Sequence, residues 1–363
     1  MKTLQIGPFK HFFTIVVSLL CVGTTAIAQD PVFSQPYMSP VYLNPAATGS
    51  GDHDLRVSGI VRRQWWNIPS RFTYTAFSID KYLPSLQSGI GFMATTSSEG
   101  YIKKTGLFLS YAYTFCPGVS SVASNGELPK WFLTSAVQAG MVQRRINYKD
   151  LLFADQIDAN GTIQGAETGA DLPVNNGRWY LDIIPGLVFN YRMNGNSRIL
   201  IGASARHVNR PDESLIATNS KVKSVLPVLW SGNILYTNSN SERWTYSIAA
   251  NFSKQQNNQL LQVGVEVTQN EYDIGIAAWY RGGASFQNPD AFSLALSFNL
   301  SGRNNQNSKI RAGIAHDSPI GNKKYTNTNG SSEFAFVWDQ NTYNTNSDNP
   351  CKPEISSRIC PRD

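Results

Sequence analysis

Two short groups in this sequence combine the residue types that metal sites and hydrolases use. Asp52-His53-Asp54 joins an imidazole to two carboxylates, and His316-Asp317-Ser318 contains the three residue types of a catalytic triad. Metal ligands and triad members must converge in space, whereas successive residues of an extended chain point to opposite faces. We therefore expect no metal site and no triad here, and we interpret residues 52–54 as a solvated loop entering a strand.

The rest of the sequence offers no further sign of enzymatic chemistry. It has no phosphate-binding glycine loop, no G-x-S-x-G elbow and no H-E-x-x-H helix. Gly282-Gly283 fits a strand end with a turn or bulge. The excess of basic residues is small and scattered, which does not favour nucleic acid. The sequence thus predicts a protein that is not an enzyme, with no catalytic residue, cofactor or metal ion.

Arg62-Arg63 and Trp65-Trp66 allow two interpretations. Cations beside aromatic rings can form a binding surface. The same residues also suit the end of a membrane strand, with tryptophans at the interface and arginines among headgroups or in the lumen. We favour the second interpretation.

Strict two-residue alternation is the strongest structural signal in the chain. In residues 105–115 the odd positions are leucine, tyrosine and phenylalanine from 107 onward, while the even positions 108–114 are mostly small or polar. Residues 272–281 and 291–301 alternate in the same way, again with aromatic residues near the strand ends. A strand of a membrane barrel needs about 10 residues, with apolar residues outward and aromatic residues at both interfaces.

Reading the whole chain in this way predicts about 14 strands and therefore an all-β fold, a transmembrane antiparallel up-and-down β-barrel of the bacterial outer membrane over residues 54–339. The expected strands are 54–63, 70–81, 87–97, 103–116, 130–144, 178–193, 196–208, 223–238, 242–254, 258–269, 272–283, 291–301, 307–317 and 331–339. Short turns of such barrels face the periplasm and long links such as 117–129 and 145–177 face outward. Both termini are then expected in the periplasm.

The N-terminus reads as a secretory leader over residues 1–28. Lys2 and Lys10 precede an apolar run, and Ala26-Ile27-Ala28 forms a cleavage site. Cys21 would suggest a lipoprotein leader instead, but Leu20 before it is too bulky for that cleavage. Residues 29–53 are then a periplasmic or plug segment and residues 340–363 a polar periplasmic tail.

Three cysteines remain after the leader. Cys351 and Cys360 lie close together in a chain routed to an oxidising compartment, so they are candidates for a local disulfide. A zinc site is less favoured because no paired histidines lie nearby. Cys116 is then expected to be a free, buried or lipid-facing thiol.

One stretch resembles a known family. Residues 30–49 contain Phe33-Ser34-Gln35, Tyr37, and Leu43-Asn44-Pro45-Ala46 followed by Gly49. This resembles the opening of the PorP/SprF family of type IX secretion system outer-membrane proteins. The similarity continues, in the same order, at Arg63-Gln64-Trp65, Gly89-Ile90-Gly91, Gln138-Ala139-Gly140, residues 153–157, Trp279-Tyr280-Arg281 and Cys360-Pro361. Trp66 and the final Asp363 depart from the family pattern.

The resemblance implies a non-enzymatic barrel that binds protein in secretion and gliding motility. The implied partners are the C-terminal sorting domain of a secreted surface protein or adhesin, and periplasmic ring or peptidoglycan-binding components that the barrel would link to the outer membrane. A porin or hydrophobic-solute channel is the alternative, and a hydrolase is a third hypothesis that lacks a converging serine and histidine. We expect the partner-binding or plug residues to be Phe33, Gln35, Tyr37, Tyr42, Leu43, Asn44 and Pro45.

Overall fold

The computed structural model describes residues 30–51, 54–68, 72–116, 130–148, 151–158, 160–165, 167–170, 177–194, 196–214, 223–239, 243–283, 289–300, 308–320 and 328–340. The described residues from Pro31 onward form one compact unit. The expected leader, Asp52-His53, Cys351, Cys360 and the tail beyond residue 340 lie outside the described residues. Their assignments stay predictions.

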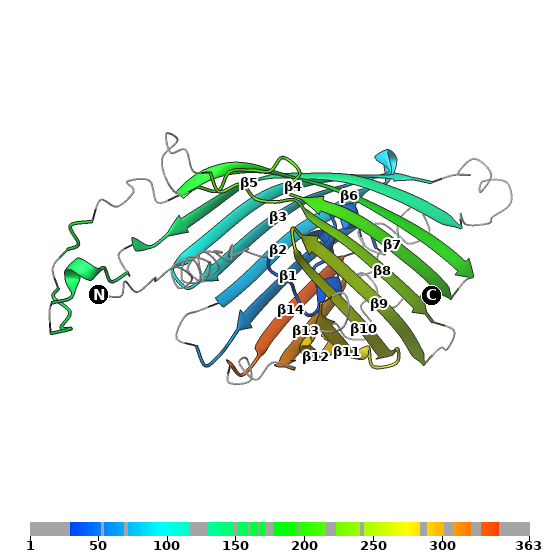
Figure 1. The fold of residues 1–363 in the computed structure, drawn as a ribbon. Helices are drawn as coiled ribbons and strands as arrows, with labels where there is room; N and C mark the ends of the chain where they lie inside the picture. Colours follow the sequence, from blue (N-terminus) through cyan, green and yellow to red (C-terminus); the bar gives the residue numbers. More distant parts are fainter. Residues whose placement is uncertain are drawn as a thin grey trace, which may run out of the picture. The chain divides into compact units, whose positions relative to one another are not determined.

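The described residues form fourteen strands (Figure 1). They are β1 (Leu55–Gln64), β2 (Phe72–Leu83), β3 (Ser88–Glu99), β4 (Ile102–Phe115), β5 (Trp131–Ile146), β6 (Gly177–Asn194), β7 (Ser197–Arg206), β8 (Leu229–Asn238), β9 (Trp244–Gln255), β10 (Asn258–Gln269), β11 (Ile274–Gly282), β12 (Pro289–Asn299), β13 (Ser308–Pro319) and β14 (Ser331–Gln340). Each pairs antiparallel with its sequence neighbour, and β1 pairs with β14 to close the barrel. The prediction of a 14-stranded antiparallel barrel is confirmed.

Apart from the start of β8, the strand boundaries lie within two residues of the prediction, and two of the differences have local reasons. β7 ends at Arg206 because His207 adopts a left-handed backbone with φ of 59°. β8 begins at Leu229 rather than residue 223, because Val225 forms an isolated bridge with Asp212 and Pro227 has no N–H to donate. Gly282 lies at an irregularity in the β11–β12 pairing, as expected for a bulge.

The barrel has two ends, which we name by the first strand. The proximal end is where β1 begins and β14 ends, and the distal end is the opposite one. The link 117–129 was expected outside with the other long links. β4 ends and β5 begins at the proximal end, so this long link joins them there, at the end where the short turns before β7, β9 and β11 also lie.

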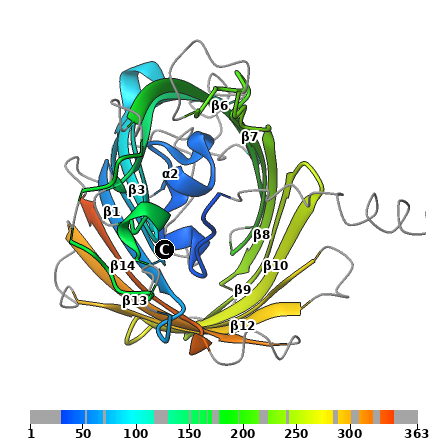
Figure 2. The same ribbon diagram turned by 60° about the vertical axis from the view of Figure 1, so that its left-hand side comes forward.

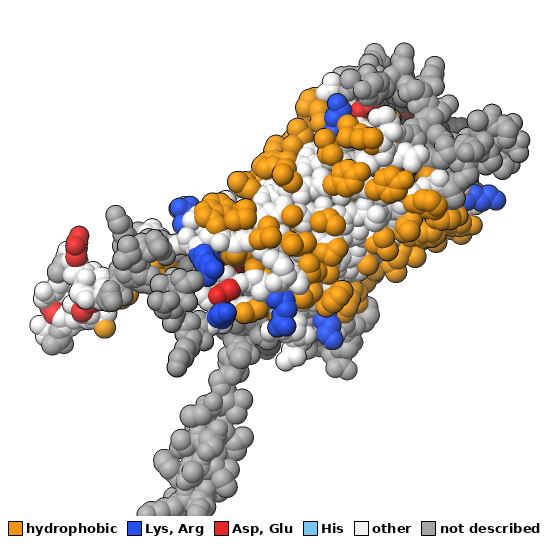
Figure 3. Space-filling model, turned by 90° about the horizontal axis from the view of Figure 1, so that it is seen from above, with side chains coloured by type: hydrophobic (Ala, Val, Ile, Leu, Met, Phe, Trp, Pro, Cys, Tyr) orange, Lys and Arg blue, Asp and Glu red, His pale blue; other side chains and the backbone are white. Residues whose placement is uncertain are grey.

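The alternation of side chains is confirmed. Along β4 the odd-numbered residues of 107–115 are exposed and the even-numbered residues of 108–114 are buried. β11 and β12 follow the same rule, with Trp279 and Ala295 buried inside. Apolar side chains cover much of the outer surface seen in Figure 3. An apolar outer surface on a closed barrel is the arrangement that a lipid bilayer requires.

The chain before β1 lies inside the ring of strands. It forms three short turns, η1 (Pro36–Met38), α2 (Pro40–Leu43) and η2 (Pro45–Ala47), each with a proline in its first turn. Figure 2 shows α2 surrounded by the strands. None of the helices among the described residues is long and apolar enough to cross a membrane.

Cys116 corrects one expectation. It is buried beside Phe132, but it is part of a disulfide rather than a free thiol. The other cysteines of the chain lie outside the described residues.

The outward face of β4 gives a first prediction. Leu109 is 68% exposed in the middle of the apolar surface. Leu109→Arg should lower the free energy of unfolding in lipid vesicles by roughly 2–4 kcal/mol, because it places a charge near the bilayer centre. Thr105→Arg, on the same face nearer the distal end, should cost about 0–1 kcal/mol. Equal losses in denaturant titrations of the two variants would contradict the assignment of this face to lipid.

Candidate functional site

The segment of residues 31–51, called the N-terminal segment below, runs inside the barrel from near the distal end to the proximal end. Phe33 packs with Ile60, and its carbonyl accepts a hydrogen bond of 3.0 Å from Gln262 in the distal half of β10. At the other end of the segment, the carbonyl of Ser50 accepts one from Arg56, one residue into β1. Residues 31–35 therefore lie far from the proximal end, where β1 begins and both termini were expected.

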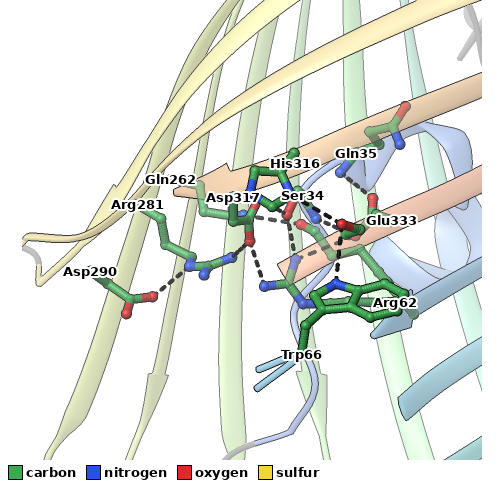
Figure 4. Close-up of polar contacts among 12 residues, drawn as sticks. Ser34, Gln35, Arg62, Trp66, Gln262, Arg281, Asp290, His316, Asp317 and Glu333 are labelled. Carbon is green, nitrogen blue, oxygen red and sulfur yellow. Dashed lines mark hydrogen bonds and ion pairs between the residues drawn. The ribbon is translucent and has the colours of Figure 1, made fainter. Parts of the chain in front are cut away.

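A cluster of four charges holds the segment near the distal end (Figure 4). It consists of Arg62 on β1, Arg281 on β11, Asp317 on β13 and Glu333 on β14, and we call it the ion cluster. Arg62 contacts both Asp317 and, at 3.5 Å, Glu333, while Arg281 binds Asp317 at 2.8 Å. All four side chains are buried.

The ion cluster binds the backbone of the N-terminal segment directly. Glu333 accepts hydrogen bonds from the N–H groups of Ser34 and Gln35, each at 2.7 Å. The hydroxyl of Ser34 donates to Asp317 at 2.5 Å and accepts from Arg62. The two buried arginines balance the two buried carboxylates in charge, which reduces the large cost of burying ions. The more exposed Asp290 adds a further carboxylate, which binds Arg281 at 2.6 Å. The hydrogen bonds fix the position of the chain as well as its charge.

A second ion pair fixes the segment near the proximal end. Arg56 binds Asp80 through two hydrogen bonds of 3.0 and 2.8 Å, and it donates to the carbonyls of Ala47 and Ser50. The N–H of Gly49 donates to the same carboxylate at 2.7 Å. Both charged side chains are completely buried.

Glycines let the segment approach the wall at this point. Gly49 has φ of +69°, and a Cβ on it would lie 2.6 Å from the Cα of Gly89 in β3. A Cβ on Gly89 would come within 2.1 Å of the Thr48 carbonyl oxygen. Only glycine at both positions allows the two backbones to touch.

The seven residues predicted for partner binding or plugging all lie within this segment. Asn44 donates from its amide to the carbonyls of Leu187 and Ala203, both at 3.2 Å, and its side-chain oxygen accepts from Ala46. It thereby caps η2, which Pro45 begins, and joins it to β6 and β7. Leu43 is partly buried against the main apolar cluster.

The aromatic residues of the segment also contact the wall. The Tyr42 ring packs edge-on against Phe33 with centroids 4.9 Å apart, and the Arg206 guanidinium lies 4.2 Å from its centroid. Tyr37 stacks on Trp279 of β11 at 6.2 Å. Burial raises the pKa of the Tyr37 hydroxyl, so this group stays neutral. Gln35 contributes its backbone N–H to the ion cluster and buries its side chain.

The described parts of the loop after β7 contact the inner wall and the N-terminal segment near the distal end. Glu213 lies buried and binds Lys104 and Arg144, each at 3.2 Å. Leu226 joins an apolar cluster with Val41 of the N-terminal segment. A cavity remains between η1 and strands β10–β13, bordered by Tyr37, Glu266 and Arg311.

Most of the charged anchors of the segment were not predicted from the sequence. Arg56, Asp80, Asp317 and Glu333 all point inward, whereas the even positions of residues 108–114 are mostly small or polar. Arg62 also lies in the lumen, one of the two places that the interpretation of a membrane strand end allows for it. These charged residues occupy inward positions in the predicted alternation of their strands. That placement could have indicated their role, because a charge on an inward position of a barrel needs a partner. As expected, His316 and its neighbour Asp317 diverge: the imidazole is exposed and binds Ser332, whereas the carboxylate is buried. Among the described residues, no group of three potential ligands is placed to hold a metal ion.

The sequence of this barrel matches a family model for the type IX secretion system membrane protein PorP/SprF over residues 25–338. The chain belongs to the PorP/SprF family. With its closed barrel and apolar outer surface, this PorP/SprF protein is an outer-membrane barrel of that secretion system. Among curated protein sequences, none matches the chain significantly.

Solved barrels resemble this PorP/SprF protein only distantly. A FadL homologue of Pseudomonas aeruginosa has 9% identity and a TM-score of 0.42, covering 83% of this chain and 93% of its own. The CymD monoaromatic hydrocarbon channel has 11% identity and a TM-score of 0.45, with 86% and 94% covered. At this level the similarities support no argument about function.

Two adjacent arginines test the ion cluster. Arg62→Ala should destabilise the folded barrel by roughly 3–5 kcal/mol, because it removes the cation that contacts Glu333 and one of the two that contact Asp317. The neighbouring Arg63 faces outward and stacks on Trp66 at 4.1 Å. Arg63→Ala should therefore cost only about 0.5–1 kcal/mol. The test is to measure the free energy of unfolding of both variants and of the wild type in the same lipid. Similar decreases in the two variants would show that the cluster does not anchor the segment.

Proposed function

We propose that this barrel is a non-enzymatic protein-binding component of the type IX secretion system. Its partner is the C-terminal sorting domain of a secreted surface protein or adhesin, which the barrel helps to secrete or hold. Periplasmic ring or peptidoglycan-binding components are a second class of partner, which the barrel would link to the outer membrane.

The observation that carries this proposal is the N-terminal segment inside the barrel. Its backbone is bound by buried ions near the distal end and again near the proximal end, with Asn44 attached between them. A segment fixed at three places is suited to act as a plug rather than a gate that opens freely. A plugged barrel offers its rims, its loops and the segment itself as binding surfaces for protein.

The alternative function is a porin or hydrophobic-solute channel. The cavity beside Tyr37 and Trp279 favours it, because it leaves part of the interior unfilled. The neutralised charges of the ion cluster argue against selective ion transport, since they face one another rather than a pore.

The partner itself is identified by purifying the affinity-tagged barrel from gently solubilised outer membranes and analysing what co-purifies by mass spectrometry. A large secreted protein with a C-terminal sorting domain supports the receptor, and ring or peptidoglycan-binding proteins support the linker. A barrel without any protein partner, combined with open-channel conductance, would overturn the proposal.

Planar-bilayer conductance tests the plug. The wild-type barrel should conduct little, whereas Gly89→Val should raise conductance several-fold by displacing residues 48 and 49. Gly232→Val is the matched control, because a Cβ there meets only one atom, at 3.9 Å. Deletion of residues 31–51 gives a second way to open the lumen. A large, steady conductance of the wild-type barrel would contradict the plug and favour the channel.

A further inference from the structure

Two cations lie side by side on the outer surface near the distal end. Lys103 on β4 is directly opposite Arg145 on β5, and both side chains are exposed. Directly opposed residues of antiparallel strands have Cβ atoms about 4.5–5.5 Å apart, and like charges at that distance destabilise the pair. Neither side chain forms an ion pair with any residue that the structure describes. The repulsion is therefore not compensated within the described part of the chain.

The level of this pair relative to the membrane follows from the strand register. Two residues closer to the middle of β4, on the same outward face, Thr105 lies opposite Gln143 of β5. Gln143 in turn lies opposite the exposed Trp179 of β6. Two residues further towards the middle of the strands, the exposed Leu107 and Met141 lie opposite each other. The order from the middle outward is apolar surface, interfacial tryptophan, then paired cations. Because tryptophans of barrels lie at the interface, the cations lie among the lipid headgroups.

The same register row continues across three more strands. Lys103 is opposite Ser98, Ser98 is opposite Thr73, and Thr73 is opposite Arg63. We call this outward-facing set the basic row: Arg63, Thr73, Ser98, Lys103 and Arg145. It contains three cations, two hydroxyls and no acid. Figure 3 shows lysine and arginine side chains gathered at one end of the barrel beside its apolar surface.

We propose that the basic row binds the phosphate groups of a phosphorylated glycolipid in the leaflet at the distal end. A guanidinium can hold two phosphate oxygens at once, an ammonium adds a point charge, and the hydroxyls of Thr73 and Ser98 can donate further hydrogen bonds. A phosphate between Lys103 and Arg145 removes their repulsion. The acyl chains of the same lipid meet Leu107 and Met141, which a soluble anion would not use. Because cations and apolar side chains adjoin on this surface, it favours a lipid over a free anion.

The test uses the folded full-length barrel in non-ionic detergent. It is titrated with diphosphorylated lipid A and, separately, with the same lipid after removal of its phosphates. Native mass spectrometry counts the bound lipid. The variant is Lys103→Gln/Arg145→Gln. The control, Lys81→Gln/Lys254→Gln, removes two exposed lysines that face only uncharged residues across their strands.

Phosphorylated lipid A should bind the variant at least about tenfold more weakly than the wild type, since each cation near an anionic lipid surface contributes about 1 kcal/mol. The control should change by less than about twofold, and lipid without phosphates should bind all three proteins alike. Equal weakening in the control, or equal binding of the dephosphorylated lipid, would overturn the site. Inorganic phosphate that displaces lipid A at equal concentration would make this a soluble-anion site and also overturn the proposal. If the double variant does not fold, Lys103→Gln alone is compared with Lys254→Gln.

Discussion

The pairing of β1 with β14 is the constraint on which the rest of this molecule depends. A strand edge cannot be left open in hydrocarbon, because each unpaired N–H or C=O there costs several kcal/mol. Ten residue pairs from Leu55–Gln340 to Gln64–Ser331 close the ring. Closure creates an interior that is shielded from lipid, and only such an interior can contain completely buried arginines and carboxylates. The N-terminal segment, the ion cluster and the lipid-facing belt all follow from that closed ring.

Inside the ring, the segment and the wall stabilise each other by polar contacts more than by apolar area. Its turns are too short to be stable alone, since one or two helical turns do not repay their ordering entropy. The wall supplies what the turns lack: Glu333 accepts two backbone N–H groups, Arg56 donates to two carbonyls, and Asn44 attaches η2 to β6 and β7. The segment in turn gives these buried polar groups partners that water would otherwise have to provide.

Much of this architecture could be predicted from the alternation of apolar and small or polar residues along each strand. The alternation exists because the wall of the barrel separates lipid on its outside from the lumen on its inside. Leu109 and Phe108 differ in exposure because one faces lipid and the other the lumen, and the period of two records that directly. Long-range partners leave no such periodic record. Ser34 meets Asp317 across 283 positions of sequence, and neither residue type indicates the other. The placement of Phe33 and Tyr37 in the lumen could be suspected from the family resemblance, but the path of the chain from the distal end could not.

The ion cluster has a further consequence for how the barrel is made. Arg62 belongs to the first strand, Asp317 and Glu333 to the last two, and Ser34 and Gln35 to the chain that precedes them all. These groups meet beside the seam where β14 pairs with β1, so the ring and the N-terminal segment share one set of buried ions. Closing the wall and placing the N-terminal segment therefore satisfy the same buried ions, so the two events are thermodynamically coupled.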